Sequence, residues 1–282
     1  MRIKIYAALL FLFSILDISA QSSFSLELNT KTEPTEKITR NETEIGFGVL
    51  KNIGSEIKIT NTLKYKKTGI NYELEKYNLQ DNLTDFSSFE NNFEITYALN
   101  RKTSLNIEIK PTINFEENVG ISDVNILGGL KINHIFNPSN SISIGTQRST
   151  LFGKTTILPT FSFLHRMHQN MAIEIGFPNS QFSYSNNNKN TFLFKNNFQG
   201  AIYNLDTPEP NDNYNNATKM TYSQMATTLE YERSIDSSWS INFKGGYGFH
   251  NKYYLTDNKG DLKYDFNSNN GYIFNIGIKF KH

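Results

Sequence analysis

The feature that most constrains the fold of this chain is an apolar alternation with a period of two, which recurs from residue 23 to residue 281. The last segment, "GYIFNIGIKFKH", shows it clearly. Every second residue from Tyr272 to Phe280 is apolar, and the positions between Phe274 and Phe280 are Asn275, Gly277 and Lys279. Such alternation is typical of β-strands with one apolar face. Because no segment has a convincing amphipathic helical pattern, the sequence predicts an all-β protein.

Turn-forming residues divide the alternation into as many as fourteen strands. Short connections such as "NIGS", "NRKT", "NPSN" and "SIDSS" indicate antiparallel hairpins, and we expect them all at one end of the sheet. Long polar connections are expected at 68–88, 147–156, 204–219 and 254–270. The strands at 171–177 and 180–186 are short and flank Pro178, and twelve strands remain if both are omitted. The expected strands are 23–31, 42–51, 56–67, 89–99, 104–115, 122–136, 140–148, 156–166, 171–177, 180–186, 191–204, 219–233, 238–253 and 271–281.

Charge is confined to one face of the clearest strands, which are 93–99, 105–115, 239–249 and 272–280. None of the 21 positions in the apolar phase is charged, although about four would be expected from the chain's charged fraction of 20%. The 17 positions of the opposite phase carry five charged residues. These five are the candidate functional residues of the sequence: Glu94, Glu108, Lys110, Lys244 and Lys279.

Two architectures have such a one-sided sheet. A soluble sandwich packs two apolar faces together, whereas a membrane barrel exposes one apolar face to lipid and encloses a polar lumen. The chain is only 38% hydrophobic yet contains 22 Phe and 15 Tyr, which suits a single apolar surface with aromatic girdles. A charge on the lipid face costs about 2–4 kcal/mol at mid-membrane. We therefore expect a transmembrane antiparallel up-and-down β-barrel of 12–14 strands, with a secreted sandwich as the alternative.

The amino terminus indicates export from the cytoplasm. Arg2 and Lys4 precede an eleven-residue apolar run from Ile5 to Ile15, and a small residue, Ala20, follows at a suitable cleavage position. This is the pattern of a secretory signal peptide, and the run is too short to span a bilayer comfortably as a helix. We expect residues 1–20 to be removed after Ala20, residues 21–282 to form one barrel domain, and the protein to reside in the outer membrane.

Two stretches carry a resemblance to a known family. "FPNSQFSY" at 177–184, followed by "NNFQGAIYNL" at 196–205, resembles a porin-like outer-membrane β-barrel family of unknown function from Gram-negative bacteria. Barrels of this kind often end on an aromatic residue that the assembly machinery reads. Here Phe280 is followed by Lys281 and His282, so the chain departs from that ending. The resemblance implies a barrel inserted by the barrel-assembly machinery.

The composition excludes several chemistries. Cysteine is absent, which removes disulfides, thiolate metal sites and cysteine nucleophiles. The net charge is +1 and scattered, so nucleic acid is a poor partner. We find no phosphate-binding loop or catalytic motif, and we expect no metal, no cofactor and no enzymatic activity.

The sequence favours a passive pore or porin-like transporter of small solutes, with outer-membrane lipid as its surroundings. One alternative is a structural or adhesive barrel with an occluded lumen, which acts through loops 68–88, 204–219 and 254–270. Another is a barrel enzyme that acts on lipid, which would need a Ser/His or acid/base pair near a membrane interface. The solute, the openness of the lumen and the oligomeric state stay undetermined at this level.

Overall fold

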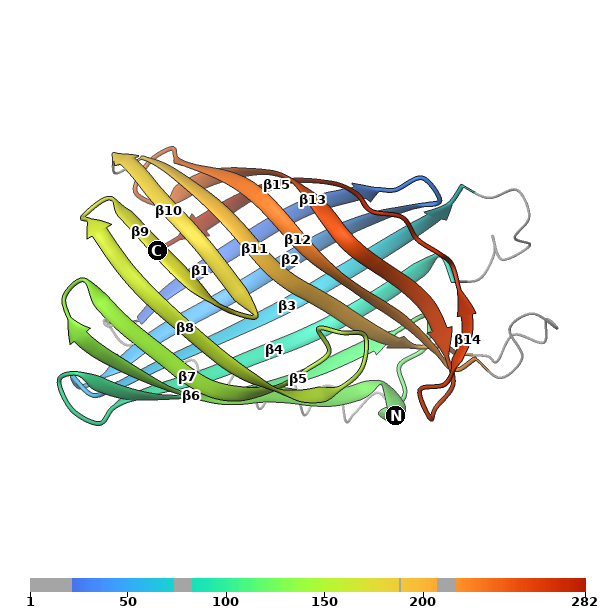
Figure 1. The fold of residues 1–282 in the computed structure, drawn as a ribbon, viewed down its shortest axis with the longest axis horizontal. Coiled ribbons are helices and arrows are strands. Elements are labelled where there is room, and N and C mark those ends of the chain that lie inside the picture. The colour runs from blue at the N-terminus through green and yellow to red at the C-terminus, as the bar shows by residue number, and fades with distance from the viewer. Residues whose placement is uncertain (1–21, 74–82, 188, 207–216) are drawn as a thin grey trace.

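The chain forms an antiparallel β-barrel (Figure 1). The computed structural model describes residues 22–73, 83–187, 189–206 and 217–282. The expected signal peptide and its cleavage site lie outside these residues. The described elements are β1 (Ser22–Pro34), β2 (Ile38–Ile53), β3 (Ile57–Tyr72), β4 (Asp85–Ala98), β5 (Thr103–Phe115), the 3₁₀ helix η1 (Ile121–Asp123), β6 (Val124–Asn137), β7 (Asn140–Ser149), β8 (Thr156–His168), β9 (Met171–Phe177), β10 (Asn179–Asn187), β11 (Asn190–Asn204), β12 (Lys219–Ser234), β13 (Trp239–Thr256), β14 (Leu262–Asp265) and β15 (Gly271–Lys281).

Fourteen strands close the ring. Each of β1 to β13 pairs with its sequence neighbour, β15 pairs with both β1 and β13, and the strand order has no crossover. β14 is an additional short strand that pairs only with the end of β13. The expectation of an up-and-down barrel is confirmed, and the count is fourteen because β9 and β10 are both present. β14 lies within the segment that we expected to be a loop.

The connections differ between the two ends of the barrel. Both chain ends of the barrel domain and the short hairpins after β2, β4, β6, β8, β10 and β12 lie at one end, which we call the short-turn end. The other, the long-loop end, carries the longer connections. It also carries two short connections, 35–37 between β1 and β2 and Pro178 between β9 and β10. The short turns named from the sequence all lie at the short-turn end, so that expectation is confirmed. β1 and β2 both continue beyond their apolar alternation because charged residues pair between these two strands.

The outer surface is apolar over the middle of the strands. On β15, Tyr272, Phe274, Ile276 and Ile278 are 61%, 52%, 49% and 38% exposed. The neighbouring strand adds Leu28, which faces Ile278 in the register and is 46% exposed. Large apolar side chains stay exposed over a wide area only where something other than water covers them. Lipid supplies this cover, and the pairing of every wall strand satisfies the backbone polar groups that lipid cannot. No helix among the described residues is long and apolar enough to cross a membrane.

The inner face of the barrel is polar and closely packed at the level of β15. Asn275 and Gly277 lie between the exposed aromatic and aliphatic positions of this strand. A Cβ atom at Gly277 would collide with the side chains of Asn29 and Asn242. Glycine at this position leaves room for two asparagine side chains from the neighbouring strands, which would have to shift if a larger residue replaced it.

Candidate functional site

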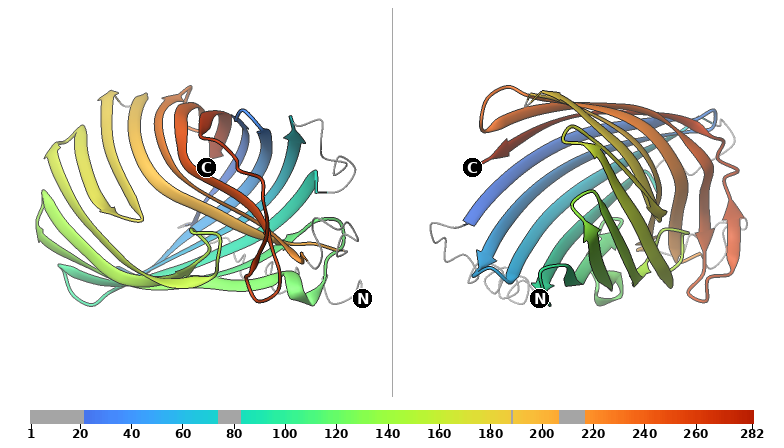
Figure 2. Two further views of the ribbon diagram at one scale, coloured as in Figure 1. Left: turned by 45° about the vertical axis from the view of Figure 1, so that its right-hand side comes forward. Right: turned by 60° about the vertical axis from the view of Figure 1, so that its left-hand side comes forward.

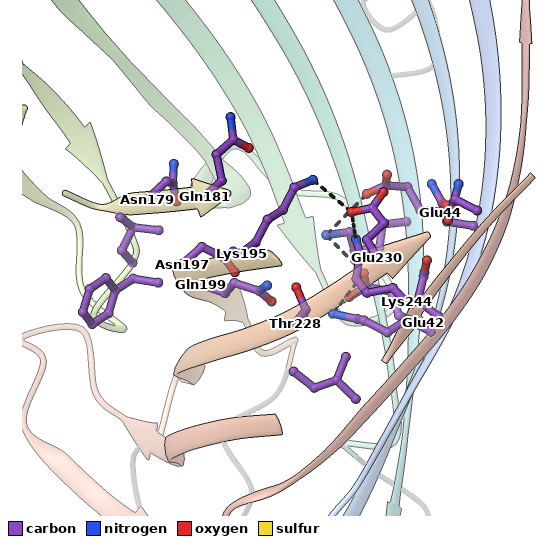
Figure 3. Close-up of a pocket in the computed structure, with 18 of the residues that line it drawn as sticks. Glu42, Glu44, Asn179, Gln181, Lys195, Asn197, Gln199, Thr228, Glu230 and Lys244 are labelled. Carbon is purple, nitrogen blue, oxygen red and sulfur yellow. Dashed lines mark hydrogen bonds and ion pairs between the residues drawn. The ribbon is translucent and has the colours of Figure 1, made fainter. Parts of the chain in front are cut away.

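The candidate site is a cavity of about 840 Å³ inside the barrel. Its wall comes from strands that surround the lumen, and most of its side chains are polar (Figure 3). Six lysines and five carboxylates line it, together with asparagine, glutamine and threonine side chains from β10 to β13 and β15. The charged residues are Lys31, Lys64, Lys66, Lys110, Lys195 and Lys244, and Glu27, Glu42, Glu44, Glu174 and Glu230.

Charges alternate in sign across β1, β2 and β3. The ammonium group of Lys64 lies 2.9 Å from the Glu44 carboxylate. Lys66 lies 3.5 Å from Glu42 and 3.7 Å from Glu44, and Lys31 approaches Glu42 from the other side at 3.6 Å. Each carboxylate on β2 therefore lies among lysines of its neighbouring strands, and this part of the wall is nearly neutral.

A buried network of charged side chains centred on Arg40 extends this wall toward the long-loop end. The guanidinium of Arg40 donates to Glu33 and Glu42, at 2.5 Å each, and lies 4.3 Å from the centre of the Tyr222 ring. Glu33 also accepts hydrogen bonds from the Tyr222 hydroxyl at 3.2 Å and the Gln224 amide at 2.8 Å. All of these side chains are buried. Burial of charges is tolerated here because each charge has several partners.

The part of the wall formed by β11, β12 and β13, which β15 separates from β1, has a different charge arrangement. Glu230 on β12 accepts from Lys195 of β11 at 2.9 Å and lies 3.6 Å from Lys244 of β13. Two lysines thus share one carboxylate. Figure 3 shows Glu230 between these lysines, with the amide side chains of Asn179, Gln181, Asn197 and Gln199 farther along the wall.

The five residues expected from the sequence occupy two levels of the barrel. Lys110 and Lys244 line the cavity, and Lys110 lies 3.7 Å from Glu90. Glu94 and Glu108 face each other in the register of β4 and β5, and Glu94 accepts a hydrogen bond from Asn106 at 2.7 Å. Lys279 faces Glu27 in the register of β15 and β1. Glu94, Glu108 and Lys279 are not among the cavity-lining residues.

Most of the cavity's charges were missed because the phase rule was applied to only four strands. In β2 the apolar alternation is Ile45, Phe47 and Val49, so the same rule places Glu42 and Glu44 inside. Applied to every other strand, it also places the remaining cavity lysines and carboxylates in the inner phase. The rule does not predict which side chains meet across the lumen, because contact between distant strands depends on the shape of the ring.

The long-loop end of the barrel is closed by an apolar cluster. Phe86 of β4 and Tyr203 of β11 are seven strand-to-strand steps apart in either direction around the ring. A circular ring of fourteen strands at the usual spacing would hold the backbones of opposite strands roughly 20 Å apart. Here Asn204 of β11 pairs with Phe115 of β5, the neighbour of β4, and the ring centroids of Phe86 and Tyr203 are 4.9 Å apart. The barrel is therefore flattened here. The buried cluster consists of Ile38, Ile70, Leu83, Phe86, Tyr203, Ala217, Met220, Tyr222, Tyr253, Leu255 and Phe266.

Carboxylates outside the strands hold the connections at this end. Glu116 accepts backbone N–H groups from Leu83 at 3.1 Å and Asp206 at 3.2 Å. Asp206 in turn accepts from the backbone N–H groups of Glu117 and Asn118. Burial raises the pKa of the Glu116 carboxyl, and the two N–H donors act in the opposite direction. Three connections thus meet over the closed end.

Metal ligation has no support in the described part of the chain. No group of three or more His, Asp or Glu side chains there is suitably placed to hold a metal ion. His165 of β8 instead hydrogen-bonds the Asn140 side chain at 2.8 Å.

One solved structure with a TM-score above 0.5 supports the fold, and two others are similar at lower scores. The COG4313 outer membrane channel from Pseudomonas putida F1 has a TM-score of 0.51 at 5% identity, with 94% of this chain and 97% of that chain covered. A Pseudomonas aeruginosa FadL homologue has a TM-score of 0.45 at 8% identity, covering 92% and 89%. The KdgM porin has a TM-score of 0.39 at 7% identity, covering 91% and 98%. At these identities the likeness concerns the fold alone.

Comparison with curated protein sequences gives no match. A family model, in contrast, matches residues 16–281, which is nearly the whole chain. The expectation of a porin-like barrel family of unknown function is thereby confirmed. The protein belongs to the family described as "Domain of unknown function (DUF6268)".

Proposed function

We propose that this protein is an outer-membrane transporter that passes small polar solutes through its lumen. The observation that carries the proposal is the cavity of about 840 Å³, which is enclosed by the barrel wall and lined by lysines, carboxylates and amides. Lumen charges of this kind tune the solute preference of barrels.

The balance of charge indicates the kind of solute. Positive and negative side chains line the cavity in nearly equal number, and most lie within 4 Å of an opposite charge. A lumen of one sign would concentrate counter-ions, whereas this one favours neither sign strongly. We therefore propose small neutral or zwitterionic solutes in place of highly charged ones.

The apolar cluster makes this a gated transporter in the conformation described. Passage along the barrel axis requires that the apolar cluster around Phe86 and Tyr203 open, because its buried side chains pack together from opposite sides of the ring. The wild-type protein should therefore have low conductance in a planar bilayer, with rare openings.

The test compares the wild type with the double variant Phe86→Ala, Tyr203→Ala. Removal of both rings should raise single-channel conductance and the uptake of small sugars or glycine into proteoliposomes. A gel-mobility shift on boiling verifies that each barrel is folded. If both proteins are folded and neither conducts nor transports, the proposal is rejected.

Export and membrane assembly are part of the proposal. We expect cleavage after Ala20 and insertion into the outer membrane by the barrel-assembly machinery. Cell fractionation and mass determination of the mature protein test this, because the mature chain should begin at Gln21. Recovery of the chain in the soluble fraction would contradict it.

The closed end favours a second candidate, a structural or adhesive barrel. Glu116 and Asp206 tie three connections together over the apolar cluster, which would present a fixed outer surface. Replacing 74–82 and 207–216 with short Gly/Ser linkers should then abolish surface binding and leave conductance unchanged. The transporter is favoured if the Phe86→Ala, Tyr203→Ala variant conducts and the loop-replacement variant shows no loss of surface binding.

A further inference from the structure

Three neighbouring strands of the barrel wall carry positive charge without any acidic residue. Residues 124–173 contain no Asp or Glu, although 27 acidic residues in 282 would give about five in a stretch of this length. The stretch, which we call the acid-free segment, spans β6, β7 and β8, and these are consecutive in the wall (Figure 2). Its basic residues are Lys131, Arg148, Lys154 and Arg166. A counter-charge for them has to come from outside these strands.

Arg148 faces the membrane. It shares the phase of Ile144 on β7, which is 59% exposed, and its register partner on β8 is Ile157, which is 71% exposed. Arg148 is itself exposed. A charge on the lipid face is unfavourable in hydrocarbon, so this guanidinium needs a polar partner at the membrane surface.

The Arg148 side chain is held in one direction along the outer surface. Its register partner on β6, Gly128, has no side chain to obstruct it. The guanidinium donates to the carbonyl of Ile126, which lies two residues nearer the long-loop end of β6. That carbonyl is available because the register of β6 with β7 ends at Gly128, and the β5 partner of Ile126 is Pro111, which has no N–H. The bond to a neutral carbonyl uses one of five N–H donors and leaves the positive charge uncompensated.

The guanidinium lies near the level of the lipid head groups at the long-loop end. β7 begins at Asn140 after a short hairpin, and Arg148 is eight residues farther along the strand. At about 3.3 Å per residue and a tilt of about 40°, the Cα atom of Arg148 is about 20 Å from the short-turn end. The apolar band of such a barrel is about 25 Å tall. A long side chain directed toward the long-loop end covers most of the remaining distance.

A lipid supplies the counter-charge better than a second copy of the chain does. Among the described wall strands, Asp85 is the only carboxylate in the outward phase, and it already pairs with Lys67 at 3.2 Å. The neighbours of Arg148 on the outer surface are exposed isoleucines, Ile126 and Ile157 among them, and these suit acyl chains. Arginine matches a phosphate group through two parallel N–H donors.

We infer that the outer surface of β6, β7 and β8 binds an anionic phospholipid, with Arg148 on the phosphate group and the exposed isoleucines against the acyl chains. The bound lipid provides the negative charge that the acid-free segment lacks. The inference goes beyond transport, because it concerns the outer surface of the barrel and is independent of conduction through the lumen.

Lipid-selective quenching of a tryptophan beside Arg148 tests the site. Ile157→Trp is made in a Trp239→Phe background, since Trp239 is the single tryptophan of the chain. The protein is reconstituted in phosphatidylcholine vesicles with a minor fraction of phosphatidylglycerol, and either one lipid or the other carries brominated chains. The binding constant at position 157 should be about fivefold higher for phosphatidylglycerol than for phosphatidylcholine, a ratio equivalent to about 1 kcal/mol.

A control reporter on the same surface separates this site from general attraction to anionic lipid. Ile276→Trp on β15 is seven strand-to-strand steps from β7 and is also exposed to lipid. The ratio of binding constants at position 276 should be about one. An equal ratio at positions 157 and 276 would overturn the inference.

The role of the guanidinium has a matched control variant. Arg148→Gln should lower the ratio at position 157 to about one. Arg166→Gln should leave it unchanged, because Arg166 is also exposed and also donates to a backbone carbonyl, that of Pro138 at 3.2 Å, but lies at the short-turn end. A ratio that survives Arg148→Gln, or that falls equally in both variants, would reject Arg148 as the phosphate ligand.

Two further measurements complete the test. A gel-mobility shift on boiling verifies that each protein is folded, and Ile144→Trp reports on the same surface if Ile157→Trp does not fold. Inorganic phosphate in the buffer should not displace the brominated phosphatidylglycerol, because the site faces lipid. Displacement would show an anion site open to water and would reject the lipid as its ligand. Conductance has no part in these readouts, so the inference and the proposed function fail separately.

Discussion

At the scale of single residues, an ion pair contributes very differently to the free energy of unfolding on the two faces of the barrel wall. Arg40 is buried between Glu33 and Glu42, and removal of its charge would leave two carboxylates without their guanidinium. Lys67 pairs with Asp85 at 3.2 Å, but both side chains are about 60% exposed. Similar distances therefore predict different energies.

We expect Arg40→Met to lower the free energy of unfolding by about 3–5 kcal/mol, because it leaves buried charge uncompensated. Lys67→Met is the matched control and should cost at most about 1 kcal/mol. Urea titration of each variant in lipid vesicles, followed by Trp239 fluorescence, measures both. Equal losses would show that the Arg40 network contributes no more than a surface pair.

The shared carboxylate on β12 sets a second residue-scale expectation. Glu230 lies between Lys195 and Lys244, so Glu230→Gln leaves both ammonium groups without that partner. In the opened Phe86→Ala, Tyr203→Ala background, the reversal potential in a KCl gradient should shift toward chloride. Glu117→Gln in an exposed connection should leave it unchanged. A shift toward potassium would contradict the assignment of these lysines to the conducting path.

At the scale of elements, the alternation defines each strand by a lipid face and a lumen face. On β15, Ile276 lies near the middle of the outer face and is 49% exposed, while its neighbour Asn275 lines the cavity. Ile276→Lys should lower the free energy of unfolding by about 2–4 kcal/mol, because a mid-membrane lysine must be buried in hydrocarbon.

Asn275→Lys is the control for that substitution, since it adds the same charge one residue away but to the polar lumen. It should fold with a loss below that of Ile276→Lys. Refolding into vesicles and urea titration give both values. A larger loss at position 275 would mean that the two faces of β15 are assigned the wrong way round.

The strands themselves were largely predictable because lipid imposes a local pattern. β15 was expected at 271–281 and is found there, and the expected strands at 171–177 and 180–186 are present as β9 and β10. The connection between β1 and β2 was expected to be longer, at 32–41, than the observed 35–37. Residues such as Glu33 and Arg40 interrupt the apolar pattern, yet they continue the strands by pairing with each other.

Contacts across the lumen were not predictable from local pattern. Glu33 accepts from Gln224, 191 residues away, and Phe86 touches Tyr203 on the far side of the ring. Such contacts depend on how far the ring departs from a circle. Alternation specifies which face a residue is on but carries no information about this global shape.

At the scale of the whole molecule, the two ends of the lumen differ. The cavity lies on the short-turn side of the apolar cluster, and barrels of this class usually have their short turns in the periplasm. We therefore expect water-borne reagents to reach the cavity from the periplasm and not along the axis from the cell exterior.

The absence of cysteine from the sequence makes this asymmetry measurable. In a host without general porins, a small charged thiol reagent added to intact cells should not label Asn275→Cys, which lies in the cavity wall. It should label Lys259→Cys, which is exposed in the connection between β13 and β14. Disruption of the outer membrane should make position 275 reactive, as should the Phe86→Ala, Tyr203→Ala background in intact cells. Labelling of position 275 in intact wild-type background cells would show that the long-loop end is open, because the apolar cluster would then not separate the cavity from the exterior.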